Sequence, residues 1–561
     1  MTRYLLAAEA DQIQDLIFRA SRLREVVGGS QLLSRFCKEG AVELLKKHGG
    51  NPDQDIIIND GGAFRILFEA PDDSQAKNKA EKFGNDLAEL YRRVTGGNLT
   101  VAEPVPYNGD FRAASQQAQE KLRDAKNRGD VPATAVHLPY LAFCASCGIT
   151  IAVRRHKRHR DERENYYCDS CLRKEKERDA EVEKLKEESN KGGFLGLFYE
   201  AVSSACESED LTNVPEVPPQ DADDIAVFDL TGRRYVAYLL ADGNGMGAWF
   251  SACLDEQSMK SLSSALPETL RTSLAASCPA LFRQIEKKNK KQILPVLPLI
   301  LGGDDLFALL PAPWAIDFAA RFCREYEKQM KEKLSELNLL EGDNVPTITA
   351  AVVICKANYP HMLAHRLGEE LLEEGKQLAR GREAHPDTNK RARVSVLNFA
   401  LVTGNEVGRP VTEESARYRP AACPYFVTHN IRGGLKDAGI SVRWLLQHRF
   451  HLSKLPGKRR AEFERLYDDI TSVESEDELK EQWRPRWEAL LNRIRRTDAQ
   501  IGDAVEEALK ELGEGTKPEL AYWKPFDRWP GKGFWGHGFP DLLTIWDYAY
   551  DLDKDASEYE E

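Results

Sequence analysis

Residues 297–314, which read LPLILGGDDLFALLPAPW, decide the fold. An apolar run is followed by two glycines, two aspartates and a second apolar run that ends at prolines. This order predicts two strands joined by a tight turn, because both apolar runs have the length of a strand and glycine suits a turn. Residues 56–73, IIINDGGAFRILFEAPDD, have the same order. A helix-like run follows each stretch, so the sequence predicts one strand–turn–strand–helix unit twice.

The similarity continues on both sides of the two hairpins. Upstream, residues 3–18 and 234–250 each read as an apolar strand that ends at an acidic residue and passes into a helix. Downstream, residues 98–129 parallel residues 347–378 as strand, loop and amphipathic helix. We therefore expect a duplicated α+β unit of the ferredoxin-like kind. Any α/β chain yields related strings, but the shared Gly-Gly turn at the matching place favours the duplication.

Composition narrows the class of protein. The 561 residues predict three to five domains. A net charge of −12 argues against a uniformly basic surface and leaves room for a local basic groove. No apolar run reaches the ~18 residues of a membrane span, and the N-terminus lacks a secretory pattern. Eleven cysteines, an odd number, fit a reducing compartment, so we expect a cytoplasmic protein that contacts no membrane.

The chain divides into five parts. We expect the first copy over residues 1–140, a four-cysteine insert with a charged helix over 141–192, a short helix and linker over 193–225, the second copy over 226–410 and an α-helical C-terminal domain over 411–561. In the last part, leucine and tryptophan recur on one helix face. The acidic tail from residue 551 is expected to be disordered.

The two copies differ at Asp304 and Asp305, where the first has alanine and phenylalanine. Adjacent carboxylates at the tip of an apolar hairpin repel each other and need solvent or a cation. Asp242 ends the strand predicted for residues 235–240, and in a ferredoxin-like sheet this strand lies beside the hairpin. Three such carboxylates can hold two Mg²⁺ or Mn²⁺ ions about 4 Å apart and act as the catalytic residues. The alternative is an ordinary surface Asp-Asp turn.

Glycines flank these carboxylates on both sides. They would let substrate phosphates approach the backbone closely and would offer backbone N–H donors. Gly243, Gly245, Gly302 and Gly303 are therefore predicted to contact a nucleotide.

Four of the cysteines form two CxxC pairs, Cys144 with Cys147 and Cys168 with Cys171. Four thiolates at this spacing predict a closed, structural Zn²⁺ site. Four unrelated thiols and a redox pair are the alternatives. Between the pairs, residues 154–160 read RRHKRHR, which is either a solvated loop or a finger that contacts nucleic-acid phosphates.

The order of these motifs is more specific than any one of them. Over essentially the whole chain, the motif order resembles that of a known subunit family. The motifs are, in order, LREVVGGSQLL at 23–33, the cysteine insert, ADGNGMG at 241–247, LGGDDLF at 301–307 and a helical C-terminal domain. The family is the large polymerase/cyclase-like subunit of type III CRISPR effector complexes. The resemblance implies that the two copies are palm domains, of the GGDEF and polymerase kind, and that the first is degenerate.

In this family the GGDD palm condenses ATP into cyclic oligoadenylates when the complex binds target RNA. The resemblance implies ATP as substrate, and other effector subunits, guide RNA and target RNA as partners. It assigns the metal-ligand role to Asp242, Asp304 and Asp305. It suggests nucleotide contacts at Gly28, Gly29, Ser30, Asn244 and Lys376.

Two departures from the family pattern bear on function. Many members begin with an HD nuclease domain, whereas this sequence starts at the first palm and has no His-Asp dipeptide, so we expect no HD-dependent DNA cleavage. Asn244 stands where the family often has a second aspartate. The same palm chemistry could instead join ATP to another acceptor such as S-adenosylmethionine. A non-catalytic scaffold subunit and a stand-alone signalling cyclase are further alternatives.

Overall fold

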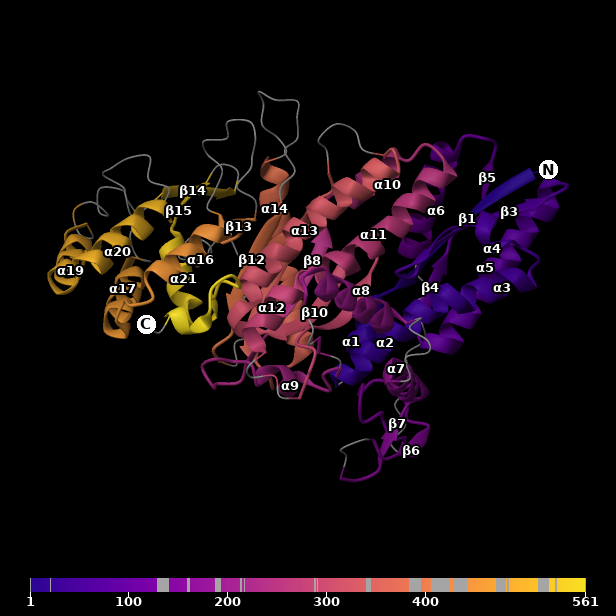
Figure 1. Ribbon diagram of the computed structural model, residues 1–561. Helices are drawn as coiled ribbons and strands as arrows, with labels where there is room; N and C mark the ends of the chain where they lie inside the picture. Colours follow the sequence, from indigo (N-terminus) through magenta and orange to yellow (C-terminus); the bar gives the residue numbers. More distant parts are fainter. Residues whose placement is uncertain are drawn as a thin grey trace.

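The computed structural model describes most of the chain and shows four parts in space. Two sheet domains lie side by side, a small cysteine-containing insert projects from the first, and the C-terminal helices lie on the far side of the second (Figure 1). The described residues are 2–20, 22–128, 141–158, 162–186, 193–211, 214–215, 217–286, 289, 291–339, 345–382, 395–404, 423–427, 441–470, 481, 484–512, 524–529 and 532–559.

The first sheet domain is antiparallel, with the strand order β2–β3–β1–β4, and β5 pairs with the other end of β1. Its strands are β1 Thr2–Asp11, β2 Ile56–Asp60, β3 Ala63–Ala70, β4 Asn98–Val101 and β5 Val105–Tyr107. Its helices are α1 Ile13–Phe18, α2 Leu23–Arg35, the π-helix Phe36–Gly40, α3 Ala41–Lys47, α4 Pro52–Asp55, α5 Asp73–Thr95 and α6 Phe111–Arg128. Helix α5 begins where the Asp72 side chain accepts a hydrogen bond from the Gln75 N–H and ends at Gly96 in the left-handed conformation.

The second sheet domain has the order β13–β12–β11–β8–β10–β9. Its strands are β8 Tyr235–Gly243, β9 Leu297–Gly302, β10 Asp305–Pro311, β11 Ile348–Lys356, β12 Val396–Leu401 and β13 Tyr425–Phe426. Its helices are α10 Met246–Ala252, α11 Glu256–Ala276, α12 Cys278–Ile285, a 3₁₀ turn Ala312–Trp314, α13 Ala315–Glu336 and α14 His361–Arg382. Strand β8 is central and buried almost throughout, as its unbroken apolar run dictates.

The predicted duplication is confirmed by the strand orders. β2–β3–β1–β4 of the first domain corresponds to β9–β10–β8–β11 of the second, and each central strand has antiparallel neighbours on both sides. In both domains a helix follows the last shared strand, α6 in the first and α14 in the second. Both copies are therefore the expected ferredoxin-like unit.

The hairpin registers correct the alignment of the two copies. Asp60 pairs with Ala63 in the first hairpin, and Gly302 pairs with Asp305 in the second. Asp304 and Asp305 therefore correspond to Gly62 and Ala63. The alignment of the sequences alone, which set them against alanine and phenylalanine, was wrong by one residue, because the two Gly-Gly pairs occupy different places in their turns.

The insert packs mainly on the first domain through its helix α7 Asp169–Lys186, whereas the connecting helices α8 Phe194–Ser208 and α9 Ala222–Ala226 pack mainly on the second domain. The insert also contains β6 Arg154–His156 and β7 Asn165–Tyr167. Helix α7 lies along α2 so closely that a side chain at Gly28 would overlap the backbone carbonyl of Lys174, 1.8 Å from the Cβ position. The absence of a side chain at Gly28 is what allows this approach.

The C-terminal domain is mostly helical, as predicted. Its elements are α16 Val442–His451, α17 Gly457–Ile470, α19 Arg484–Thr497, α20 Ala499–Glu511, the hairpin β14 Lys524–Trp529 and β15 Lys532–Gly536, α21 Gly538–Thr544, and the 3₁₀ turns Trp546–Tyr548 and Ala556–Tyr559. Trp487, which is 1% exposed, packs in its core. No helix within the described ranges has both the length and the apolar character needed to cross a membrane.

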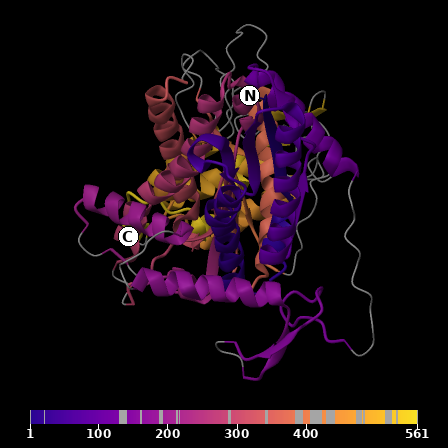
Figure 2. The ribbon, with the colours of Figure 1, turned by 90° about the vertical axis from the view of Figure 1, so that its right-hand side faces the viewer.

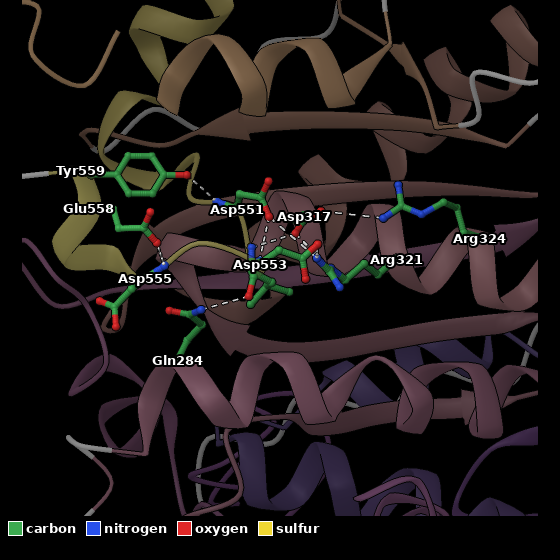
Figure 3. Close-up of polar contacts among 10 residues, drawn as sticks. Gln284, Asp317, Arg321, Arg324, Asp551, Asp553, Asp555, Glu558 and Tyr559 are labelled. Carbon is green, nitrogen blue, oxygen red and sulfur yellow. Dashed lines mark hydrogen bonds and ion pairs between the residues drawn. The ribbon is translucent and has the colours of Figure 1, made fainter. Parts of the chain in front are cut away.

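The acidic tail docks on the second domain, so the expectation of disorder was wrong for residues 551–559. Arg321 of α13 contacts the carboxylates of Asp317 and Asp553 at 3.0 and 2.7 Å (Figure 3). Tyr559 is buried at the end of this segment. Two of the charges that suggested a solvated tail, those of Asp551 and Asp553, instead contact Arg321 of the second domain.

Candidate active site

Strand pairing brings the three predicted carboxylates to one edge of the second sheet. Leu306 of β10 lies opposite Ala241 of β8, and the same register places Asp305 beside Asp242 where both strands reach the turn. Asp304 lies in the turn itself, directly after Gly303. The φ of +61° at Gly303 is a left-handed conformation that glycine adopts without steric strain because it has no Cβ atom. The sheet therefore gathers Asp242, Asp304 and Asp305 as predicted.

The surroundings of Asp304 and Asp305 disfavour the charged forms of these two carboxyl groups. Burial, followed by the negative charge of Asp242, raises the pKa of Asp304 to about 6. Burial, followed by the charges of Asp242 and Asp304, raises the pKa of Asp305 to about 7, although solvent still reaches the Asp305 side chain. Lys376 of α14 supplies the nearest positive charge, with its Nζ 2.5 Å from Asp242 Oδ2. Negative charge is thus concentrated here beyond what one lysine balances, which favours a bound cation.

A pocket of about 280 Å³ opens beside the carboxylates, between the two sheet domains. Asp242, Asp305 and Lys376 line it from the second domain. The first domain contributes the tip of its own hairpin, where a side chain at Gly61 would come within 3.9 Å of the Gly303 nitrogen. The two Gly-Gly turns therefore face each other across the site.

Of the predicted nucleotide-binding glycines of the second domain, Gly302 lines the pocket. A side chain added at Gly245, Gly302 or Gly303 would meet no atom within 4 Å, so there is space beside the backbone at these positions. Gly243 is different, because a side chain there would strike Met246 at 2.6 Å. Gly243 is thus required by local packing, whereas the other three leave room for a ligand.

Two of the three residues suggested in the first domain do not face the pocket. Ser30 lines it. Gly28 faces the backbone of α7, and Gly29 lies 3.5 Å from the Lys174 side chain, measured from the Cβ position. The expected nucleotide contacts at Gly28 and Gly29 are therefore wrong, because this glycine pair serves the crossing of two helices.

Asn244 is also bound within the protein. Its amide nitrogen donates to Thr347 Oγ1 at 3.1 Å, and its amide oxygen accepts a hydrogen bond from Thr349 Oγ1 at 2.7 Å. The residue is 6% exposed. The expectation that Asn244 contacts a nucleotide is wrong, since its amide instead ties the end of β8 to β11.

The donor set of the site suits a hard divalent cation. Three carboxylates offer the oxygen ligands that Mg²⁺ and Mn²⁺ prefer. Their oxygens do not all lie within 4.8 Å of one another, and in the described part of the chain the four cysteines alone form a cluster that tight. A site that shares two ions with substrate phosphates does not need its three carboxylates to enclose one ion.

The four predicted zinc ligands come together in the insert. Their sulfur atoms all lie within 4.8 Å of one another, and Cys147 Sγ is 3.9 Å from Cys168 Sγ. Tetrahedral Zn²⁺ with Zn–S bonds of about 2.3 Å separates its sulfurs by about 3.8 Å. Cys144, Cys147, Cys168 and Cys171 therefore fit one structural zinc ion, whose identity stays a prediction.

The basic run beside the cysteines divides into two groups. Arg158 is buried, pairs with Glu25 of α2 and stacks on Tyr167, with its guanidinium carbon 3.7 Å from the ring centre. It fixes the insert to the first domain, so it cannot contact nucleic acid. Arg154, Arg155 and Lys157 are exposed, and the nucleic-acid hypothesis stays open for them.

The second sheet domain matches a known family model. Residues 235–385 match the second palm domain of Cas10/Cmr2. The chain carries a Cas10-type palm. Among solved structures, a Csm1–Csm4 cassette in complex with pppApA is similar with a TM-score of 0.50 and 14% identity, over 98% of this chain and 70% of that chain. The cassette in complex with one ATP has a TM-score of 0.49 and 13% identity over the same shares. No curated protein matches the sequence.

The structure adds pocket residues to the Cas10-type palm that the sequence did not indicate. Lys38 and Asp60 of the first domain and Arg271 of α11 line the pocket. Asp60 lies in the first hairpin, residues 56–73, although the sequence assigns it no role there, whereas Lys38 and Arg271 belong to no motif and are placed by tertiary packing alone. Glu369 is different: it lies seven residues before Lys376 on α14, so helical spacing could have placed both on one face.

Proposed function

We propose that this protein is the Cas10-type palm subunit of an RNA-guided type III CRISPR effector and that it condenses ATP into cyclic oligoadenylates. The observation that carries the proposal is the pocket between the two palms, with Asp242, Asp305 and Lys376 on one wall. The shared fold with a Csm1–Csm4 cassette solved with pppApA supports it. Guide RNA, target RNA and neighbouring effector subunits are its proposed partners.

The pocket has both an apolar wall and positively charged side chains, the two features that suit a nucleoside triphosphate. Part of the pocket wall is apolar and could pack against the base of a nucleotide; it is formed by Ile17, Leu33, Phe194 and Leu301. Cations suited to a triphosphate lie on the same pocket, one on the first domain and two on the second; they are Lys38, Arg271 and Lys376. A site with apolar walls and a few convergent charged groups is typical of a small-molecule pocket.

The residues divide the work as follows. Asp242, Asp304 and Asp305 would hold two Mg²⁺ or Mn²⁺ ions, which when bound activate a ribose 3′-hydroxyl and stabilise the pyrophosphate leaving group. Lys376, now paired with Asp242, lies where it can turn to the triphosphate once cations neutralise that carboxylate. The first palm, which has Gly62 and Ala63 at the carboxylate positions, would bind one nucleotide without contributing metal ligands.

The 3′-hydroxyl of one ATP would attack the α-phosphate of the other. The new bond would be a 3′–5′ phosphodiester, because the α-phosphate is attached to the 5′-oxygen of the ribose. Pyrophosphate would leave with the electron pair of the broken P–O bond. The protein contributes positioning and preorganised charge.

The test is to incubate the RNA-bound assembly with ATP and Mn²⁺ and to identify the products by mass. Cyclic oligoadenylates that disappear with the variant Asp304→Asn/Asp305→Asn would support the proposal. A product that contains adenylate joined to S-adenosylmethionine, when this acceptor is added, would replace it with the alternative acceptor. An assembly that forms normally and makes no nucleotide product under any condition would favour the alternative that this protein is a non-catalytic scaffold subunit.

A further inference from the structure

A basic groove runs along the first palm and the insert, apart from the active site. It consists of two adjoining hollows of about 310 and 480 Å³ that share Arg93 and Arg173. The cations on its walls are Arg19, Arg35, Arg92, Arg93, Arg173, Lys174 and Lys176. The acids on the same walls are Asp169 and Glu177, and three of the predicted zinc ligands, Cys147, Cys168 and Cys171, also line the first hollow. In a chain with a net charge of −12, this is a pronounced local excess of positive charge.

Two of these cations form hydrogen bonds that hold the walls of the groove together. Arg173 donates hydrogen bonds to the carbonyl oxygens of Arg93 and Val94, the latter at 3.0 Å, and so holds α7 against the C-terminal end of α5. Lys174 is 2% exposed and donates to the carbonyl oxygen of Leu16. The floor of the groove is therefore fixed by contacts between the insert and the first palm.

Four of the other cations are exposed and one, Arg19, is half-buried; the exposed ones are Arg35, Arg92, Arg93 and Lys176. Arg35 pairs with Glu177 at 2.7 Å, and Arg92 pairs with Glu89. Arg19, Arg93 and Lys176 form no ion pair with any residue that the structure describes. Attraction to the carbonyl ends of α5 and α1 accounts for Arg92, Arg93 and Arg19, which lie at those ends, but it does not account for Lys176 in the middle of α7. Like charges gathered in one hollow repel each other, and an external anion would relieve this repulsion.

The shape of the groove favours a chain of phosphates over a single anion. Along α7 it extends from Asp169 to Ala180, twelve residues that span roughly 17 Å at ~1.5 Å per residue. At the end next to the cysteines, Ile151 and Val153 line it, and Val153 is 62% exposed. The hairpin β6–β7 stands out from the body of the molecule beyond this end of α7 (Figure 2). Separated cations followed by exposed apolar contacts suit a flexible strand with phosphates and bases.

We propose that this groove binds the sugar–phosphate backbone of a single-stranded nucleic acid. The cations would replace the counterions of successive phosphates, which makes binding depend steeply on salt. The proposal does not depend on the nucleotide chemistry of the pocket, since the groove and the pocket share no residue.

The test measures binding of a fluorescein-labelled 20-nucleotide oligouridylate RNA to the full-length protein by anisotropy, between 50 and 300 mM salt. The variant Arg19→Ala/Arg93→Ala/Lys176→Ala removes two exposed cations and one half-buried cation, and none of the contacts that build the groove. We expect its Kd to rise at least about tenfold, and its salt slope to fall by about 2, because each lost phosphate contact removes about 0.7 from the slope of a single strand.

A matched control removes three exposed cations elsewhere, as Arg283→Ala/Lys328→Ala/Arg366→Ala. This control should bind RNA as the parent does, and so should Asp304→Asn/Asp305→Asn, whose nucleotide chemistry is lost. The proposal is overturned if the parent does not bind RNA, if both triple variants lose affinity equally, or if the groove variant loses binding only to vesicles that contain phosphatidylserine.

Discussion

The two palms share an ion pair and differ in their hairpins. In the first, Glu9 at the end of β1 pairs with Lys126 of α6 at 2.7 Å. In the second, Asp242 at the end of β8 pairs with Lys376 of α14 at 2.5 Å. The positions are equivalent, because Glu9 pairs with Thr100 of β4 and Asp242 with Thr349 of β11.

Each lysine also lies fifteen residues after the first residue of its helix. The acid–lysine pair is thus common to both copies of the fold, whatever their chemistry. The difference lies in the turn, where Gly62 and Ala63 stand in place of Asp304 and Asp305. Metal chemistry should therefore depend on the two hairpin carboxylates, and the ion pair alone should not provide it.

The largest difference between the palms is expected in catalysis. Asp304→Asn/Asp305→Asn should lower nucleotide condensation by about 10³-fold or more, since the loss of one preorganised electrostatic group alone costs about 10²–10³-fold. In the first palm, Glu9→Gln changes the acid that corresponds to Asp242, and it should leave the rate within about twofold of the parent because no metal ligand is expected there. Both are measured as product formed from ATP and Mn²⁺ by the RNA-bound assembly. Equal losses in the two variants would contradict a division of labour between the palms.

The first palm, unlike the second, carries the cysteine insert on its helix α2. Removal of the metal by a chelator, or Cys168→Ser, should lower the free energy of unfolding by about 3 kcal/mol or more, because binding energy at a structural zinc site is folding energy. Elemental analysis should find one zinc per chain. Undiminished thermal stability in a zinc-free preparation would show that the insert holds α2 through its protein contacts, such as the Arg158–Glu25 and Arg35–Glu177 ion pairs, without help from the metal.

The next largest difference is expected between the equivalent lysines of the two palms, Lys376 and Lys126, in their effect on the kinetics. Lys376→Ala should lower kcat/KM for ATP about 10- to 100-fold, as expected for loss of one charge-assisted contact to a triphosphate worth about 1.5–3 kcal/mol. Lys126→Ala should leave the kinetics unchanged and cost less than about 1 kcal/mol of stability, as a partly exposed ion pair does. A kinetic defect in Lys126→Ala as large as that of Lys376→Ala would mean that both palms handle the triphosphate in the same way.

The smallest effect concerns stability and pH. The folded pKa of Asp305 is raised to about 7, so above pH 7 the folded protein holds a disfavoured charge, and this cost fades as the pH falls towards the ordinary aspartate value. Asp305→Asn should therefore stabilise the protein at pH 8 by about 1–2 kcal/mol, a figure reduced for solvent screening of this exposed side chain. The gain should shrink towards pH 4. Denaturant unfolding at pH 8, 6 and 4.5 measures it, and a gain that does not vary with pH would refute the assigned cause.

Much of the fold and the core of the site could be read from the sequence. The unbroken apolar run of β8 and the hairpin LPLILGGDDLFALL are local signals, and the sheet register then places Asp242 beside Asp305. The CxxC pairs likewise specify their own geometry.

The errors have physical causes that sequence patterns do not resolve. A Gly-Gly pair permits close approach of a phosphate or of another helix, and at Gly28 the helix α7 takes that place. Asn244 lies next to a predicted metal ligand, but its neighbours across the sheet are the threonines of another strand. Lys38 and Arg271 reach the pocket only because the two domains pack against each other.

The central claim is that Asp304 and Asp305 make the second palm the metal centre. Electron paramagnetic resonance titration of Mn²⁺, in the presence of a non-hydrolysable ATP analogue, tests it most directly. Two Mn²⁺ ions per chain should bind to the parent and to Glu9→Gln, and Asp304→Asn/Asp305→Asn should lose them. Equal Mn²⁺ binding by the parent and the double variant would contradict the account.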